Sequence, residues 1–201
     1  MRKIRIKDLF ASKKKPVRLS NATLNGKKVT LRKLQIKDAV YFNDTYEELR
    51  DTMYLPYNKL NNVDDYTMYL IDHIAKYEKG SAVGWAIEST KTNEFIGVIQ
   101  VYKFVEKEGR CSISFYTVKG LKDPYIIEAI NLVMQYLFST KLVRRIEVKI
   151  DANDSFTEIA LIKCGFVYEV IKRKYSFYGG EYHDVKVYAI LDDEIVLTKE
   201  N

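Results

Sequence analysis

The chain has 201 residues, a formal net charge of +6 at pH 7, and 47% hydrophobic and 13% aromatic residues. This length and composition allow a full core, which excludes a wholly disordered protein and favours one domain with short appendages. Two cysteines are too few for a disulfide scaffold, and neither has a metal-ligand partner at short spacing. We therefore expect a protein of a reducing compartment without a metal site.

Positive charge is concentrated at the N-terminus. Residues 1–15 hold seven lysines and arginines against one aspartate, so residues 16–201 carry no net charge. A body without a basic excess does not favour a nucleic-acid-binding domain, and any weak contact with polyanions would come from the arm. We interpret residues 1–20 as a basic arm that solubilises the protein or docks on it, and residues 21–201 as a single domain.

No segment of the sequence is suited to a membrane. The N-terminus is charged but lacks an apolar stretch of signal-peptide length, and no run of about 18 apolar residues occurs. We expect a cytoplasmic protein without a membrane partner.

The first part of the chain predicts a strand followed by two helices. Residues 29–34 alternate as a half-buried strand, and residues 38–49 have helical spacing. In the second helix, Asp64 or Asp65 can serve as the cap, and the apolar residues on one face are Tyr66, Leu70, Ile74 and Tyr77.

Three meandering strands follow. The apolar segments 83–89 and 95–102 flank a polar turn at residues 91–94 and predict a hairpin, which residues 110–117 extend. The helix after Pro124 is the most regular one, because its apolar residues form a broad stripe that includes Ile126, Ile130, Val133 and Leu137.

The last part predicts a strand, a helix and a hairpin. Residues 145–150 alternate, and residues 155–163 form a short helix that we expect to turn Phe156, Ile159 and Ala160 inward. Residues 166–177 and 182–190 form two long strands joined at Gly179-Gly180. A strand joined through a helix to a neighbouring strand predicts one parallel pair within an otherwise antiparallel sheet. The fold class is therefore α/β, a mixed sheet with about four helices.

Several local sequences, in this order, resemble the GNAT superfamily of N-acyltransferases, and most closely its branch that acetylates the N-termini of ribosomal proteins. The matching segments are Trp85-Ala86-Ile87, Phe95-Ile96-Gly97-Val98-Ile99, Glu128-Ala129-Ile130, Lys163-Cys164-Gly165-Phe166 and Tyr182-His183-Asp184. The similarity extends from Lys27 to Leu191. It implies the GNAT fold, in which the parallel strands splay apart to form a V-shaped gap.

The resemblance implies acetyl-CoA as the co-substrate, an amine as the acceptor, and no metal. Backbone groups near Phe115, Tyr116, Thr117 and Val118 would pair with the pantetheine arm, as an added strand does. The diphosphate would lie at the N-terminus of the Pro124 helix, where unpaired amides favour an anion. The cofactor-binding residues there would be Lys122, Asp123, Tyr125 and Ile126.

The diphosphate loop departs from the family pattern and is degenerate. Both glycines of the family loop are missing, Pro124 removes one amide, and Asp123 adds a negative charge beside the expected anion. Lys119 and Lys122 could offset that charge. This loop is the main argument against ordinary acetyl-CoA binding.

The expected catalytic residues also differ. Ser112 occupies the position of the family's glutamate base, and a serine cannot accept the proton of an ammonium group. The family's Asn-x-x-Ser aligns with Asp154 to Thr157, where Asp154 is interpreted as a helix cap in preference to a catalytic residue, and Thr157 keeps a hydroxyl. Tyr116 is a candidate proton donor to the leaving thiolate.

Other polar residues have weaker claims. Tyr168 and Tyr178 are further candidate donors that we interpret as packing residues, and Glu158 could replace the base if it faced the cleft. His73, in an apolar helical stripe, is interpreted as a half-buried structural residue, and His183 as a hairpin residue.

Three functions remain open from the sequence, the weakest of which is an RNA- or ribosome-associated factor that uses the basic arm of residues 1–15. The first is an acyl-CoA-dependent N-acyltransferase, with acetyl-CoA as the expected donor, that acts on a primary amine of a protein N-terminus or a small molecule. The alternative is a catalytically degenerate GNAT-like protein that binds or regulates and does not use acetyl-CoA. A homodimer is compatible with an exposed strand edge, but no heptad pattern predicts it.

Overall fold

The computed structural model describes residues 19–41, 62–78, 83–117, 123–178 and 180–195. The strands of the described chain are β1 (Leu24–Asn25), β2 (Val29–Lys33), β3 (Val83–Ser89), β4 (Phe95–Val105), β5 (Arg110–Thr117), β6 (Arg145–Asp151), β7 (Val167–Tyr178) and β8 (Glu181–Leu191). The helices described in full are α2 (Val63–Glu78), α3 (Asp123–Ser139) and α4 (Ser155–Lys163), with short 3-10 turns η2 (Ile36–Asp38) and η3 (Glu106–Glu108).

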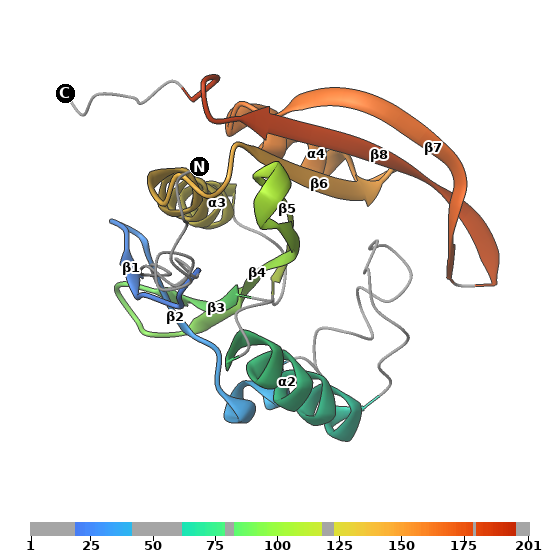
Figure 1. Cartoon of the computed structure of the whole chain (residues 1–201). Coiled ribbons are helices and arrows are strands. Elements are labelled where there is room, and N and C mark those ends of the chain that lie inside the picture. The colour runs from blue at the N-terminus through green and yellow to red at the C-terminus, as the bar shows by residue number, and fades with distance from the viewer. Residues whose placement is uncertain (1–18, 42–61, 79–82, 118–122, 179, 196–201) are drawn as a thin grey trace, which may run out of the picture.

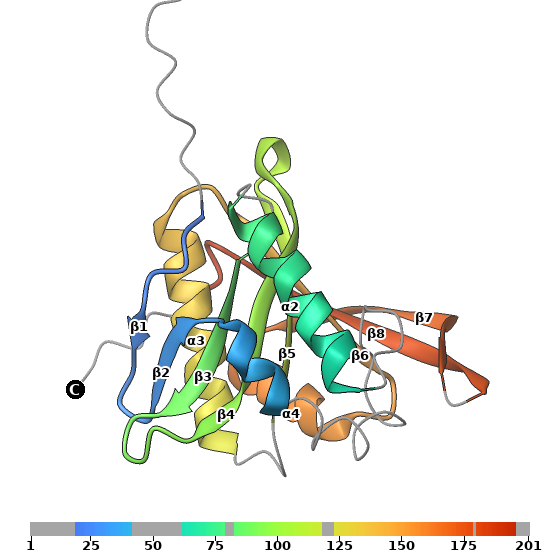
Figure 2. The same ribbon diagram turned by 90° about the horizontal axis from the view of Figure 1, so that it is seen from below.

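The eight strands form one twisted sheet in the order β1-β2-β3-β4-β5-β6-β8-β7 (Figure 1). All neighbouring pairs are antiparallel except β5 and β6, which are parallel and joined through α3. Seen from below, α2 lies in front of the sheet, and α3 and α4 lie behind it (Figure 2). The mixed α/β sheet with one parallel pair is as predicted.

Most element bounds follow the sequence periodicity. The strands at 83–89 and 110–117 and the helix at 155–163 have the predicted bounds. The two-residue strand β1 was not predicted, because two residues show no period. A helix begins at residues 39–41, and the rest of the predicted 38–49 helix lies outside the described residues.

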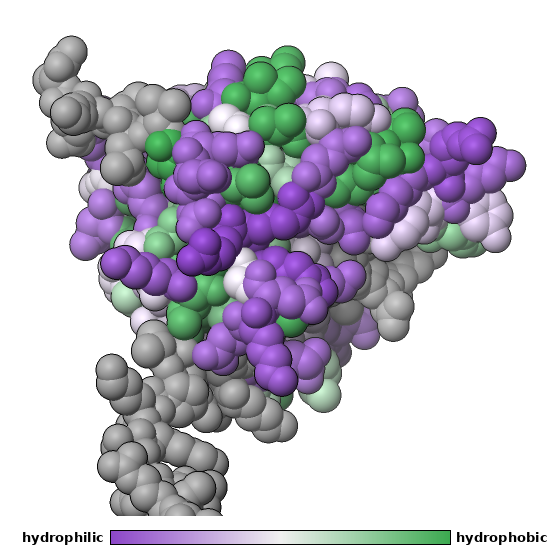
Figure 3. Space-filling model, turned by 45° about the horizontal axis from the view of Figure 1, so that its top comes forward, coloured by the Kyte–Doolittle hydropathy of each residue, from purple (hydrophilic) through white to green (hydrophobic). Residues whose placement is uncertain are grey.

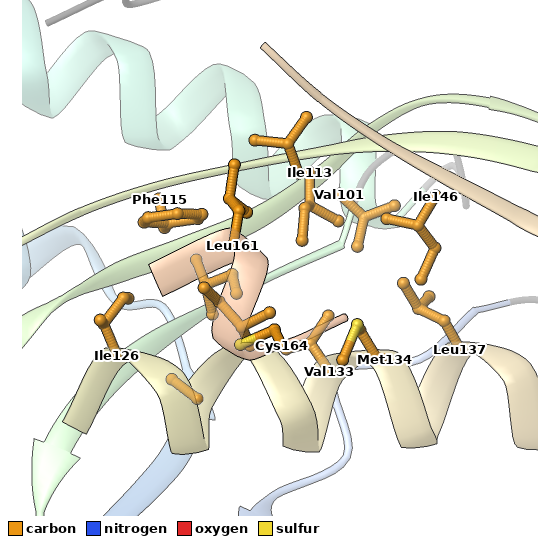
Figure 4. Packing of buried hydrophobic residues seen from close by; sticks show 14 of the residues in the cluster. Val101, Ile113, Phe115, Ile126, Val133, Met134, Leu137, Ile146, Leu161 and Cys164 are labelled. Atoms are coloured by element: carbon orange, nitrogen blue, oxygen red, sulfur yellow. The ribbon is translucent and has the colours of Figure 1, made fainter. Parts of the chain in front are cut away.

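The larger core lies between the sheet and the helices α3 and α4. The predicted stripe of α3 is completely buried: its residues are Ile126, Ile130, Val133 and Leu137. Figure 4 shows Ile126, Val133 and Leu137 of this stripe on the side of α3 that faces Ile113, Phe115 and Ile146 of the sheet. Leu161 of α4 and its C-cap residue Cys164 lie beside them. The broad apolar face that the sequence predicted therefore builds the main hydrophobic core.

Helix α4 turns a different face inward from the one expected. Ala160 is buried as predicted, but Phe156 is 38% and Ile159 is 49% exposed, and the second buried apolar residue is Leu161. The helix has apolar residues on several sides, so periodicity could not select the face that packs against α3. The surface near β7 and β8 accordingly has hydrophobic patches separated by hydrophilic residues (Figure 3).

A smaller cluster lies on the opposite face of the sheet, under α2. It joins Tyr66 and Leu70 of α2 to Ala86 of β3 and Val98 of β4. Among the described residues, no helix is long and apolar enough to cross a membrane.

Leu19 and Ser20, at the end of the expected arm, pack against the domain. Leu19 is buried in the larger core, and the amide of Ser20 donates a hydrogen bond to the Tyr136 hydroxyl at 2.7 Å. Trp85 donates its indole N–H to the Ala22 carbonyl at 2.8 Å. Leu19 and Ser20, assigned to the arm from the sequence, therefore belong to the packed domain.

Glu128 of α3 fastens the edge of the sheet. Its carboxylate accepts hydrogen bonds from the amides of Lys27, Lys28 and Val29, at 2.9, 2.7 and 2.8 Å. Lys27 and Lys28 lie in the turn between β1 and β2, and Val29 is the first residue of β2. The Glu128-Ala129 sequence that resembles the family thus has a structural role in this chain.

Candidate functional site

The parallel strands β5 and β6 separate part-way along their length. Three residue pairs join them, from Arg110 and Arg145 to Ser112 and Glu147. Beyond that point β5 continues to Thr117 and β6 to Asp151 without pairing to each other, and the two ribbons diverge (Figure 1). Parallel strands that part in this way leave room at their carboxyl ends for an extended ligand chain.

Gly97 of β4 sets the position of the diverging part of β5. A Cβ atom at Gly97 would lie 2.1 Å from the Tyr116 carbonyl oxygen and 2.8 Å from the Thr117 Cα. Both neighbours are backbone atoms, which cannot move aside as a flexible side chain does. Only glycine lets β4 approach the end of β5 this closely.

Two polar rows face each other across the divergence. Ser112 and Glu147 are register partners, so alternation places Ser114 and Tyr116 of β5 on the same face as Lys149 and Asp151 of β6. This is the α2 face, because Tyr116 packs against the cluster under α2. Phe115, by contrast, points into the larger core on the other side. Hydroxyl groups on one strand therefore face charged groups on the next.

Asp151 ends its row in a buried cluster. The Tyr178 hydroxyl donates a hydrogen bond to its carboxylate, and the His183 Nδ1 atom lies 3.4 Å from the same oxygen. The Tyr178 and His183 rings stack with centroids 3.7 Å apart, and the His183 Nε2 atom lies 3.2 Å from the Tyr178 carbonyl oxygen. The cluster fastens the tip of the β7–β8 hairpin to the end of β6.

This environment makes Tyr178 a poor proton donor. Burial, the hydrogen bond to Asp151 and that carboxylate's negative charge raise the pKa of Tyr178 above its ordinary value. His183 has an oxygen atom beside each ring nitrogen, which suits a ring that holds the hairpin. Tyr178 and His183 therefore have the structural roles expected of them.

Asp154 and Thr157 lie at the start of α4, directly after β6. Asp154 is the N-cap, and its carboxylate accepts a hydrogen bond from the Thr157 amide at 3.0 Å. The capping role, favoured from the sequence over a catalytic one, is confirmed. Thr157 is buried beneath this cap.

Glu158 does not face the divergence between β5 and β6. Its carboxylate accepts hydrogen bonds from Lys186, at 2.8 Å, and from the Tyr188 hydroxyl. Tyr188 lies on β8, on the side of β6 away from β5. The two hydrogen bonds lower the pKa of Glu158 and favour its charged form, so Glu158 stabilises the contact of α4 with β8.

The expected diphosphate site is described only in part. Val118 and Lys122 lie outside the described residues, and Asp123 is the first residue of α3. Tyr125 packs partly buried against the larger core, and Ile126 is fully buried. The side chain of Ile126 therefore serves packing, and Pro124 leaves the first turn one amide short.

Glu147 is the residue that sequence reasoning missed. Its carboxylate lies on the strand beside Ser112, the position where the family has a glutamate, and it contacts Lys149 at 3.4 Å and Arg145 at 3.5 Å. The alternation of residues 145–150 indicated a charged face. Without the register of the parallel pair, it could not indicate which residue of β5 that face would meet.

His73 and the two cysteines are buried in the packed layers. His73 is buried on α2, and burial lowers its pKa to about 4, which keeps the ring neutral. Burial likewise raises the pKa of the Cys111 and Cys164 thiols to about 12. In the part of the chain that the structure describes, no three His, Cys, Asp or Glu side chains are grouped as metal ligands.

Residues 28–167 match the family model of the acetyltransferase (GNAT) domain. The chain belongs to the GNAT acetyltransferase family. As a GNAT protein it is a transferase, and the resemblance seen in its sequence is confirmed.

Curated relatives have similar lengths. The uncharacterized N-acetyltransferase YoaA of Bacillus subtilis is 24% identical over 169 residues, which cover 84% of this chain and 96% of YoaA.

The probable N-acetyltransferase YjcK of Bacillus subtilis is 26% identical over 180 residues, which cover 85% of this chain and 99% of YjcK. Among solved structures, the ribosomal L7/L12 acetyltransferase RimL in complex with coenzyme A superimposes with a TM-score of 0.76 at 14% identity, covering 87% of this chain and all of RimL. The microcin C7 self-immunity acetyltransferase MccE, in complex with acetyl-CoA and AMP, gives 0.73 at 17% identity, covering 83% and 93%. At these identities the structures establish the GNAT fold.

Proposed function

We propose that this GNAT protein is an acetyl-CoA-dependent N-acetyltransferase that acts on a primary amine, either of a protein N-terminus or of a small molecule. The observation that carries the proposal is the end of the β5–β6 ladder at Ser112 and Glu147, beyond which both strands continue. The complexes of RimL with coenzyme A and of MccE with acetyl-CoA support it, because both proteins share the fold.

The pantetheine arm would lie between the diverging strands. Its amides would pair with the backbone of β5 at Phe115, Thr117 and Val118, as an added strand does. The diphosphate would then meet the start of α3, with Lys122, Asp123 and Tyr125 around it and Ile126 contributing through its backbone alone. Gly97 supports this arrangement, because its missing side chain lets the end of β5 lie close to β4, in the position that we propose for binding the pantetheine arm.

The reaction would be direct attack of the neutral amine on the thioester carbonyl. A nitrogen–carbon bond forms, the carbon–sulfur bond breaks, and coenzyme A leaves as a thiolate. The amides of Thr117 and Val118 would stabilise the developing oxyanion. Holding both substrates between the strands contributes to the rate without any covalent intermediate.

Two protons must move in this reaction. Glu147 would receive the proton of the amine through water, because the register sets its carboxylate beside Ser112 on the α2 face. Tyr116, four residues further along β5 on that face, would protonate the thiolate. Asp154 and Thr157 would act as positioning residues that hold the start of α4 next to the site.

The first test is calorimetric titration of the protein with acetyl-CoA and with coenzyme A. We expect micromolar binding, followed by release of coenzyme A when a panel of peptide and small-molecule amines is added. Absence of binding together with absence of release from every amine would contradict the proposal.

A matched pair of variants tests the proton acceptor. Glu147 and Glu169 both contact Arg145, at 3.5 and 2.5 Å. We expect Glu147→Gln to lower kcat by about a hundredfold, with little change in the affinity for acetyl-CoA. Glu169→Gln should keep the wild-type kcat. Equal effects of the two variants would mean that Glu147 acts through the ion pairs alone.

The alternative is a binding or regulatory protein that does not use acetyl-CoA. Pro124 favours it, since it removes an amide from the helix terminus that would hold the diphosphate. Stable folding with no acetyl-CoA binding would support this alternative, and steady release of coenzyme A with any amine would exclude it.

A further inference from the structure

Two lysines from two strands lie over the ring of one tyrosine on the α2 face of the sheet. The Lys149 Nζ atom of β6 lies 5.5 Å from the centroid of the Tyr175 ring, and the Lys172 Nζ atom of β7 lies 4.8 Å from it. The positive charge of Lys103 in β4 also contributes to lowering the pKa of Tyr175. We call Lys103, Lys149, Lys172 and Tyr175 the lysine cluster.

Two of the strands that carry these side chains are irregular close to them. Lys103 and Lys174 have positive φ angles, of 51° each, which residues other than glycine adopt rarely. The β4–β5 register shifts between Tyr102 and Val105, and the β7–β8 register shifts between Lys172 and Ser176. Such bulges redirect side chains and are frequent beside functional sites. The strands that carry Lys103 and Tyr175 are therefore irregular beside these residues.

Positive charge exceeds negative charge in the cluster. The Lys149 side chain is only 7% exposed, and its Nζ atom lies 3.4 Å from Glu147, a carboxylate that also contacts Arg145 at 3.5 Å. Lys149 and Lys172 lower the pKa of Tyr175, although partial burial opposes this shift. A largely buried ammonium group that shares one carboxylate with a guanidinium gains free energy from a further anion.

The cluster is next to the reaction site. Lys149 is the first residue of β6 on the α2 face after the ladder with β5 ends at Ser112 and Glu147. The Pro124 helix, where the diphosphate of coenzyme A would bind, packs on the opposite face of the sheet. An anion at the cluster would therefore belong to the second substrate.

We propose that the amine acceptor carries an anionic group, a carboxylate or a phosphate, which Lys149 and Lys172 bind while the amine points into the gap between β5 and β6. This inference rests on the proposed acetyltransferase function and specifies its substrate class. Because Lys149 and Lys172 both lie over one ring, the site is suited to a single anionic group close to the amine.

The experiment compares acceptors that differ in charge alone. One pair is a peptide with Asp and Glu after its N-terminal residue and the same peptide with Asn and Gln. The other pair is O-phosphoethanolamine and ethanolamine. We expect kcat/KM to favour the anionic member of at least one pair by about tenfold or more, and the preference to weaken as salt is added. The two pairs distinguish a carboxylate from a phosphate.

Substitutions test which lysines cause the preference for the anionic acceptor. Lys149→Met and Lys172→Met should each remove most of the preference, while the affinity for acetyl-CoA stays at the wild-type value. Lys91→Met, in the exposed turn between β3 and β4, is the matched control and should keep the preference. Equal kcat/KM for charged and neutral acceptors in the wild type would overturn the inference and leave the acetyltransferase proposal intact. A loss of acetyl-CoA affinity in Lys149→Met would also overturn it, because the cluster would then bind the cofactor.

A second measurement does not depend on catalysis. Inorganic phosphate is added during an alkaline titration followed by ultraviolet difference absorption, and the Tyr175→Phe variant is subtracted to isolate Tyr175. Bound phosphate should move the ionisation of Tyr175 to higher pH in the wild type and not in Lys149→Met. An unchanged titration in the wild type would argue against an anion site, even if no amine were ever acetylated.

Discussion

The face of the sheet under α3 and α4 is filled with aliphatic side chains, whereas the face under α2 combines a small apolar cluster with hydroxyls and charges. On the first face, one continuous core joins both helices to the strands β2 to β6. On the second face, Ser112, Glu147 and Lys149 lie at the point where β5 and β6 separate. The difference indicates that the layer under α3 and α4 supplies most of the stability of the fold. The layer under α2 can therefore keep polar groups whose burial costs free energy.

The strongest test of this comparison is a cavity in the larger core. Ile130→Ala should lower the free energy of unfolding by about 4 kcal/mol, because Ile130 is fully buried in α3. Lys172→Met, on the polar face, should change it by less than about 1 kcal/mol while it alters acceptor preference. Denaturant unfolding measures both. Similar losses of unfolding free energy in the two variants would mean that stability and function do not depend on separate faces of the sheet.

A smaller loss is expected where the two roles meet. Gly97→Ala should cost about 3 kcal/mol, because the added Cβ would overlap the backbone of Tyr116 and Thr117. It should also weaken acetyl-CoA binding, measured by calorimetry, since β5 must shift. Val98→Ala is the control: it removes buried methyl groups on the same strand and should destabilise the protein without changing the affinity. Equal affinities of the two variants for acetyl-CoA would show that Gly97 does not help to shape the cofactor site.

The α2 layer should also determine how stability depends on pH. His73 has a folded pKa of about 4, below its ordinary value, so the unfolded chain binds a proton more readily. Its contribution is complete above about pH 6.5 and is lost as the pH falls toward 4, by about 2 kcal/mol at pH 5. Unfolding of the wild type and of His73→Phe, measured from pH 7 to pH 5, checks this. The variant should lack that decline, and parallel curves would exclude His73 as its source.

The smallest effect is expected at the edge of the α3 layer. Glu128→Gln should cost about 1.5 kcal/mol, since an amide cannot accept from the amides of Lys27, Lys28 and Val29 as a carboxylate does. Hydrogen exchange should show faster opening of the β1–β2 turn than of α3. Unchanged protection of the turn in Glu128→Gln would show that these three hydrogen bonds do not hold the turn in place.

Much of the fold could be predicted from the sequence, because the alternation of strands and the spacing of helices are properties of local side chains. The stripe of α3 and the bounds of β3 and β5 are examples. The inward face of α4 could not be predicted, since a short helix with Phe156, Ile159 and Leu161 has apolar residues on more than one side. The face was decided by contact with α3.

The candidate site divides in the same way. The parallel pair of strands, the altered helix terminus at Pro124 and the cap at Asp154 were readable because each depends on residues close together in the chain. The meeting of Glu147 with Ser112, and of Tyr175 with Lys103 and Lys149, joins strands far apart in sequence. Such contacts depend on register and on bulges, and a strand's own alternation specifies neither.

The sequence by itself indicated the GNAT family through its resemblance to known members, and its local periodicity gave the order of the elements and the broad hydrophobic face of α3. Only the tertiary structure decided where β5 and β6 part, which carboxylate lies beside Ser112, and which lysines lie over the Tyr175 ring. The physical reason is that a strand carries its periodicity within itself, whereas its neighbours and their register are set by the packing of the whole sheet.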